Sequence, residues 1–140
     1  MRAMVPAERI KSLRRSTPGC RSLVFVDLKS RLVLCSDSDL PVPPQEALDA
    51  VCLRGARLLT GPIPAAAEAA LAAPVFEAVA VQGGRIEVFL RSPDAPDEAL
   101  CGVLEASADP DAALDVLRGG IDAILTEDAA HPVAASPRGQ

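Results

Sequence analysis

Residues 22–107 are predicted to form two β-hairpins with an amphipathic helix between them, and this order of elements constrains the fold more than any other feature of the sequence. The first hairpin is predicted over SLVFVDL and RLVLCSDS, residues 22–28 and 31–38, with its turn at Lys29-Ser30. The second is predicted over FEAVAVQ and RIEVFLRS, residues 76–82 and 85–92. Its Gly83-Gly84 pair suits the positive φ angles of a two-residue type I′ turn. This order predicts a small antiparallel α+β domain.

The strands differ in how deeply they should be buried. The nearly continuous apolar run from Leu23 to Leu28 predicts an interior strand that is covered on both faces. In residues 85–91 apolar and charged residues alternate, so one face of that strand should be buried and the other wet. A further strand is expected over about residues 98–106, with Gly102 marking a β-bulge.

The middle helix should begin near Pro44 and end at Gly61-Pro62, because proline is tolerated in a first turn and Gly-Pro is a stop signal. Gly55 and Ala56 leave two interpretations open: close approach of a second helix in a dimer, or plain packing on a strand. The alanine-rich stretch from Pro62 to Pro74 is expected to be a connector of one or two helical turns. The apolar stripe of the helix consists of Leu48, Val51, Cys52, Gly55, Leu58 and Leu59.

Terminal helices of opposite charge flank this unit. Residues 1–21 carry six Arg or Lys against one Glu, whereas residues 94–128 carry ten carboxylates against one Arg. The first helix is predicted from Pro6 to about Ser16, and the last begins at Asp109-Pro110 and should kink or break at Gly119-Gly120. We expect the two helices to lie side by side on one face of the sheet and to attract each other. Nucleic-acid binding is not expected, because aromatic stacking partners and a sustained basic face are missing.

The length of 140 residues fits one domain, which we place over residues 1–128, with a disordered tail over residues 129–140. The predicted fold class is α+β in the order αββαβββα, with the middle helix on one face of an antiparallel sheet and the terminal helices on the other. Because the chain has three Phe and no Trp or Tyr, its core must consist of Leu, Val, Ile and Ala. Such a core buries little apolar surface, and further burial in a dimer interface would stabilise the fold.

The chemistry of the side chains argues against an enzyme. The four cysteines have no C-x-x-C spacing, so they are expected to be reduced structural thiols and not metal ligands. The single histidine, His131, falls in the predicted tail. The pairs Asp37 and Asp39, and Asp94 and Asp97, are better explained by turns and caps than by acid–base catalysis. We therefore predict no catalytic residue, no cofactor and no metal site.

The sequence also bears on the location of the protein. No apolar run approaches the roughly 18 residues of a membrane span, and the N-terminus lacks the apolar region of a signal peptide. Twelve Arg against two Lys, with abundant Ala, are typical of a GC-rich bacterial genome. We expect a bacterial cytoplasmic protein without a membrane span.

The segment Pro18-Gly19-Cys20-Arg21-Ser22-Leu23-Val24-Phe25-Val26-Asp27 resembles the entry into strand one of the roadblock/LC7 domains, "p-G-v-x-g-a-v-v-v-D". The similarity spans about residues 8–125. The chain departs from the family in having Lys29-Ser30-Arg31 where a glycine is usual in the first turn. It also has a longer passage, residues 62–74, from the middle helix to the third strand.

The resemblance implies a five-stranded antiparallel sheet in a non-catalytic regulator that forms homodimers and binds a small Ras-like GTPase or a signalling complex. In that family the middle helices pack together and the third strands pair across a two-fold axis. An unpaired third strand would otherwise be an aggregation hazard. If the family's interface is transferred to this chain, the resemblance implies a dimer interface of Leu48, Val51, Cys52, Gly55, Leu58, Leu59, Val75, Phe76, Val79 and Val81.

A PAS-like or GAF-like sensor is the alternative function, since such domains also present an antiparallel sheet. That function needs a cavity in which polar groups converge on a small ligand. A ligand-dependent rise in melting temperature would favour the sensor, whereas co-purification with a GTPase would favour the regulator.

Overall fold

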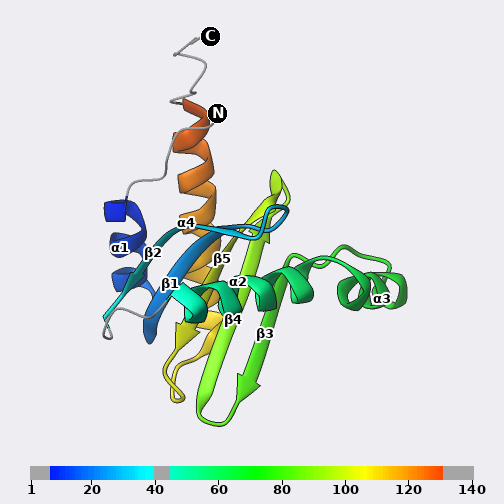
Figure 1. The fold of residues 1–140 in the computed structure, drawn as a ribbon, viewed down its shortest axis with the longest axis horizontal. Coiled ribbons are helices and arrows are strands. Elements are labelled where there is room, and N and C mark those ends of the chain that lie inside the picture. The colour runs from blue at the N-terminus through cyan, green and yellow to red at the C-terminus, as the bar shows by residue number, and fades with distance from the viewer. Residues whose placement is uncertain (1–6, 40–44, 131–140) are drawn as a thin grey trace.

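The computed structural model describes residues 7–39 and 45–130, which form a five-stranded antiparallel sheet with helices on both faces (Figure 1). The strand order across the sheet is β2-β1-β5-β4-β3. The α+β class and the antiparallel sheet predicted from the sequence are confirmed. The elements are α1 (Ala7–Ser16), β1 (Cys20–Asp27), β2 (Leu32–Ser38), α2 (Gln45–Leu59), α3 (Pro62–Leu71), β3 (Glu77–Gln82), β4 (Arg85–Ser92), β5 (Ala95–Leu104) and α4 (Pro110–Ala130).

Both hairpin turns have a local chemical cause. Gly83 and Gly84 have φ angles of +48° and +64°, as the predicted type I′ turn requires. In the first hairpin the Asp27 carboxylate accepts hydrogen bonds from the backbone N–H groups of Lys29 and Ser30, at 2.9 and 3.1 Å. Arg31 then takes a positive φ of +59°, the conformation for which the roadblock pattern uses glycine. A side-chain cap thus supports the turn that lacks this glycine.

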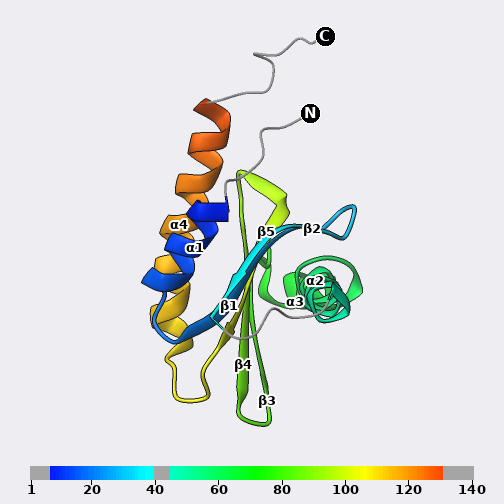
Figure 2. The same ribbon diagram turned by 60° about the vertical axis from the view of Figure 1, so that its left-hand side comes forward.

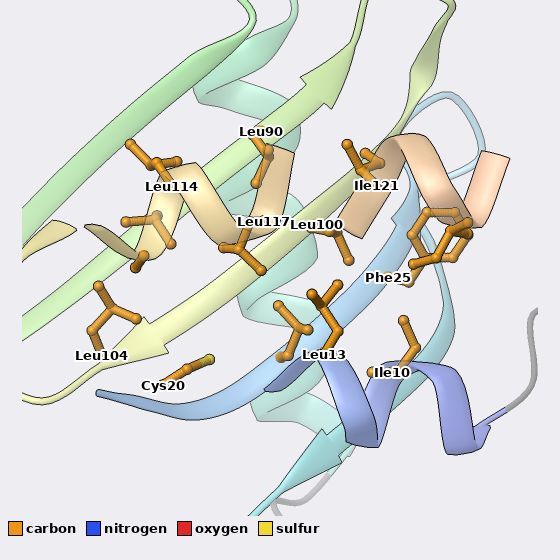
Figure 3. Close-up of a cluster of buried hydrophobic side chains, with 14 of the residues drawn as sticks. Ile10, Leu13, Cys20, Phe25, Leu90, Leu100, Leu104, Leu114, Leu117 and Ile121 are labelled. Atoms are coloured by element: carbon orange, nitrogen blue, oxygen red, sulfur yellow. The ribbon is translucent and has the colours of Figure 1, made fainter. Parts of the chain in front are cut away.

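Helices lie on both faces of the sheet (Figure 2), and each face has its own apolar core. The first core lies beneath α1 and α4 and includes Leu23 and Phe25 of β1 (Figure 3). The second core lies beneath α2 and includes Val24 and Val26 of the same strand. Strand β1 is therefore interior and buried on both faces, as its apolar run predicted. The terminal helices share one face and α2 covers the other, which also confirms the prediction. The expected core of Leu, Val, Ile and Ala was incomplete, because Phe25 and Phe89 are the largest fully buried side chains.

The prediction of a β-bulge at Gly102 was wrong. Gly102 keeps a regular register with Leu23 on β1 and Val88 on β4. A Cβ atom at this position would lie 3.2 Å from Cγ2 of Val88. The glycine therefore serves close packing within the first core, and the irregularities of the sheet lie elsewhere.

Helix α4 is not broken at Gly119-Gly120, contrary to the prediction. It contacts α1 at Leu13, where a Cβ atom on Gly120 would lie within 2.4 Å of the leucine Cδ1 atom. Gly120 therefore lets the two helices approach closely. The basic Arg14 at the end of α1 points its guanidinium toward β2. It pairs with Asp37 of β2 and, at 3.7 Å, with Asp39.

Alanine at positions 119 and 120 should have opposite effects on stability. Nothing lies within 4 Å of a Cβ atom at Gly119, so Gly119→Ala should raise the free energy of unfolding by about 0.5–1 kcal/mol through helix propensity. Gly120→Ala should lose that gain and lower stability, because inserting a methyl group against buried Leu13 costs about 1–3 kcal/mol. Urea unfolding at fixed protein concentration measures both. Equal effects of the two substitutions would contradict the close contact with Leu13.

The segment predicted as a short connector contains a full helix. Helix α3 covers ten residues, Pro62–Leu71, and therefore exceeds the expected one or two turns. It ends at Ala72, which has left-handed backbone angles, φ 55° and ψ 37°. Among the described residues, two helices, α2 and α3, thus lie between the two hairpins.

All four cysteines are free thiols. Burial raises the pKa of Cys20 to about 11 and also raises the pKa of Cys101. Both thiols are therefore protonated at neutral pH and pack as small apolar groups.

Some sequence predictions fall outside the described residues. These are the start of the middle helix at Pro44, the position of His131 and the tail from residue 131 onward. Ala129 and Ala130, which were assigned to the tail, belong to α4. Within the described part of the chain, no helix combines the length and the apolar character that a bilayer crossing needs.

Candidate interaction surface at the β3 edge

Among the strands of residues 7–39 and 45–130, β3 forms one edge of the sheet and pairs with β4 alone. Its side chains alternate between the two faces. Ala78 and Ala80 pack against the second core, whereas Val79 and Val81 point to the opposite face and remain 43% and 73% exposed. An edge strand with exposed valines and unpaired backbone groups is a template for pairing with another strand.

Four residues of the predicted dimer interface lie in the chain's own second core. Val51, Cys52 and Leu59 are buried against the sheet, and Gly55 faces β4 and β5. A Cβ atom on Gly55 would lie 3.0 Å from Sγ of Cys101 and 3.3 Å from the Phe89 ring. Packing of α2 on its own strands thus accounts for this glycine, and these four residues do not form part of the free surface.

The other six residues of the prediction are not fully buried. Leu48, Leu58, Val75 and Phe76 are half-buried, and Phe76 lies under the Arg91 guanidinium at 5.2 Å. Arg91 also donates to the backbone oxygen of Val75 at 2.8 Å. These contacts hold the start of β3 in place, next to the exposed valines. The structure therefore leaves part of the predicted set at least partly accessible, namely Leu48, Leu58, Val75, Phe76, Val79 and Val81.

Helix α3 adds an apolar surface that the sequence prediction missed. It lies on the α2 side of the sheet and beyond the β3 edge (Figures 1 and 2). Ile63 and Leu71 are 58% and 70% exposed, and Glu68 is the only charged residue of the helix. A helix without a polar face is usually buried on all sides. The missing polar face of PIPAAAEAAL was the sequence signal that could have identified this surface.

A buried carboxylate fixes α2 to the sheet beside this edge. Glu87 of β4 accepts two hydrogen bonds from Arg54 of α2, each 2.7 Å, and one from Arg85 at 3.0 Å. Burial opposes ionisation of Glu87, but the hydrogen bonds and charges of the two arginines lower its pKa below the usual value. The ionised cluster locks the orientation of α2 over β4.

A second ion pair joins α4 to the start of β3. Arg118 donates to both carboxylate oxygens of Glu77, at 2.5 and 2.7 Å, and this hydrogen bonding raises its pKa further above the ordinary arginine value. The β3 edge is thus held from both faces of the sheet.

Two of the four carboxylates considered for catalysis, Asp37 and Asp39, have structural partners. Asp37 pairs with Arg14, and Asp39 accepts hydrogen bonds from Arg21 at 2.8 and 3.0 Å. Among the described residues, no three His, Cys, Asp or Glu side chains gather into a set that could hold a metal ion. An open hollow beside the first hairpin turn is lined by Leu28, Lys29, Arg31, Thr60 and Asp97.

No family model and no curated protein matches the sequence. Solved structures do match the fold. A roadblock/LC7 domain from Streptomyces avermitilis superposes with a TM-score of 0.67 at 12% identity, covering 87% of this chain and 96% of that one. The gliding protein MglB from Thermus thermophilus gives 0.67 at 19% identity, with 88% and 87% covered.

A more distant likeness is to profilin II from Acanthamoeba castellanii, with a TM-score of 0.51 at 12% identity, covering 78% of this chain and 87% of that one. At these identities the comparisons establish the fold alone. The chain has the roadblock/LC7 fold within the broader profilin-like architecture, as its entry into the first strand indicated.

Proposed function

We propose that this protein is a non-catalytic homodimeric regulator with a roadblock/LC7 fold, and that it binds a small Ras-like GTPase or a signalling complex. The observation that carries the proposal is the unpaired β3 edge with exposed Val79 and Val81 in a chain of this fold. A homodimer would pair this edge with its own copy and remove the aggregation hazard.

In the proposed dimer the two β3 strands run antiparallel across a two-fold axis, and the two sheets join into one of ten strands. Each Val81 would then meet apolar surface of the second copy in place of water. The half-buried Leu48 and Leu58 on α2 would add to the contact on the other face. The GTPase partner rests on the roadblock resemblance, supported by the fold shared with MglB.

Val81→Lys should weaken the homodimer at least tenfold. The two-fold axis places two added charges in one interface, where they are desolvated and repel each other. Sedimentation velocity over a micromolar concentration series measures the dissociation constant. The matched control is Leu32→Lys on the opposite edge strand β2, which is 59% exposed and should leave dimerisation unchanged. A monomeric wild-type protein in this range would refute the homodimer.

The partner is tested separately by capturing the tagged protein from its native lysate with GDP or a non-hydrolysable GTP analogue present. Recovery of a small GTPase that depends on the nucleotide, identified by mass spectrometry, is the expected result. The Val81→Lys variant shows whether capture requires the dimer. Recovery of the protein alone would contradict the GTPase proposal under those growth conditions and favour the sensor.

A further inference from the structure

Helix α3 exposes apolar side chains to water, which is unfavourable for a helix that has no polar face. Ile63 and Leu71 remain more than half exposed, and most of the alanines between them are exposed as well. Isolated helices of ten residues are marginal in water, so α3 depends on tertiary contacts for its order. Within the chain these come mainly from α2, from buried Pro64 and from Glu68, which accepts a hydrogen bond from the Val75 N–H at 2.8 Å.

The position of α3 determines what can cover it. Helix α2 crosses the sheet and α3 continues past the β3 edge on the same side (Figures 1 and 2). When two β3 strands pair antiparallel, the two-fold axis is perpendicular to the sheet and each face continues into the same face of the second copy. A helix that projects beyond β3 on the α2 side must then lie over the second copy's sheet, on its α2 side.

The area of the β3 edge is too small for a stable interface by itself, so a further contact is needed. Six residues at about 3.3 Å each give a strip about 20 Å long, and strand spacing makes it about 5 Å wide, roughly 100 Å² of footprint. Stable interfaces bury about 800 Å² on each partner. Ten helical residues add a face about 15 Å long and about 10 Å wide, so α3 more than doubles the footprint available at this edge.

From this placement we infer that α3 is a dimerisation arm, which reaches across the β3 edge and packs Ile63 and Leu71 on the α2 side of a second copy of this chain. The inference rests on the proposed β3 dimer and assigns to α3 a part in its stability. It explains why an apolar helix stays exposed in the single chain. It also explains why the passage from α2 to β3 is long enough to hold a helix.

The double variant Ile63→Ser/Leu71→Ser tests the arm. Both residues are exposed in the single chain, so the far-UV circular dichroism should not change, while the dimer dissociation constant should rise at least tenfold in sedimentation velocity. The matched control is Leu32→Ser/Leu34→Ser on β2, at 59% and 38% exposure, which should leave the constant unchanged. Equal dissociation constants for the α3 variant and the wild type would overturn the arm and leave the β3 dimer standing. A monomeric wild type would overturn both.

Hydrogen exchange of the full chain gives a second readout, which altered folding stability does not imitate. When the protein concentration rises through the dissociation constant, amides of α3 and β3 should gain protection together, whereas amides of β2 should not. Protection gained in β3 without any gain in α3 would contradict the arm and again leave the β3 dimer intact.

Discussion

Replacing Phe89 with alanine is expected to lower the free energy of unfolding by about 3–5 kcal/mol, the usual cost of removing a fully buried phenylalanine. The ring is completely buried in the second core, between α2 and the sheet. Gly55 already lets α2 pack close to the Phe89 ring. The helix therefore has little room to move further and fill the cavity that the alanine would leave. Since domains of this size are typically stable by about 5–15 kcal/mol, the variant should be close to unfolding.

Urea denaturation followed by circular dichroism at 25 °C and one protein concentration measures this effect. Phe89→Leu keeps most of the volume and should cost less than about 1.5 kcal/mol, which keeps the test informative if the alanine variant does not fold. Leu32→Ala, at a 59% exposed position, should change stability by no more than about 0.5 kcal/mol. A loss for Phe89→Ala as small as that for Leu32→Ala would contradict the described second core.

Gly19→Ala is expected to destabilise the protein by about 2–4 kcal/mol, through two separate effects. Gly19 has a φ of +73°, and an L-residue in left-handed conformation costs about 1 kcal/mol or more. Its added Cβ atom would also lie 2.5 Å from Cβ of Ala108, an overlap that costs about 1–3 kcal/mol to relieve. The Gly19 carbonyl accepts a hydrogen bond from Glu105 N–H at 2.9 Å, which limits any shift of the backbone.

The two effects can be separated by urea unfolding. Adding Ala108→Gly to Gly19→Ala removes the overlap, so the double variant should recover the steric part in a double-mutant cycle. Gly83→Ala is the control for backbone conformation, because Gly83 has a φ of +48° and a Cβ atom there would meet nothing within 4 Å. It should cost about 1 kcal/mol. If Gly19→Ala were no worse than Gly83→Ala, the contact with Ala108 would be unsupported.

Features with a local cause could be predicted from the sequence. The type I′ turn depends on two adjacent glycines, and both take the required positive φ angles. Strand β4 has the predicted bounds Arg85–Ser92, because a tight turn fixes one end. The prediction that one of its faces is wet was wrong, because Glu87 and Phe89 on that face are buried beneath α2. The burial of β1 on both faces follows from its apolar run in the same direct way.

The predictions were wrong for two glycines whose packing partners are distant in the sequence. Gly102 and Gly120 each leave room for a side chain from another element, Val88 and Leu13 respectively. A sequence lists these partners far apart and gives no sign that they meet. A glycine in a strand or helix was therefore assigned to a bulge or a break, the local explanations that were available.

The candidate surface shows the same limit. The apolar stripe of α2 indicates a buried helix face, yet it cannot distinguish burial on the chain's own sheet from burial in a dimer, and Val51, Cys52 and Leu59 proved to lie in the former. The exposure of Val79 and Val81 could be expected from the edge position of β3. The helix in residues 62–74 was underestimated as one or two turns, because an apolar sequence without a polar side has no periodic pattern that marks its length.

The strand order makes the folding of the whole sheet depend on β5, the last strand in the sequence. Strand β5 lies at the centre of the sheet and joins the two hairpins, and its pairing with β1 brings together residues as distant as Cys20 and Leu104. During synthesis both hairpins are complete before the strand that connects them exists, and a lone hairpin is marginally stable in water. Contacts of such high sequence separation slow folding. The chain should therefore fold late and as one cooperative unit, so that neither hairpin outlasts the loss of β5.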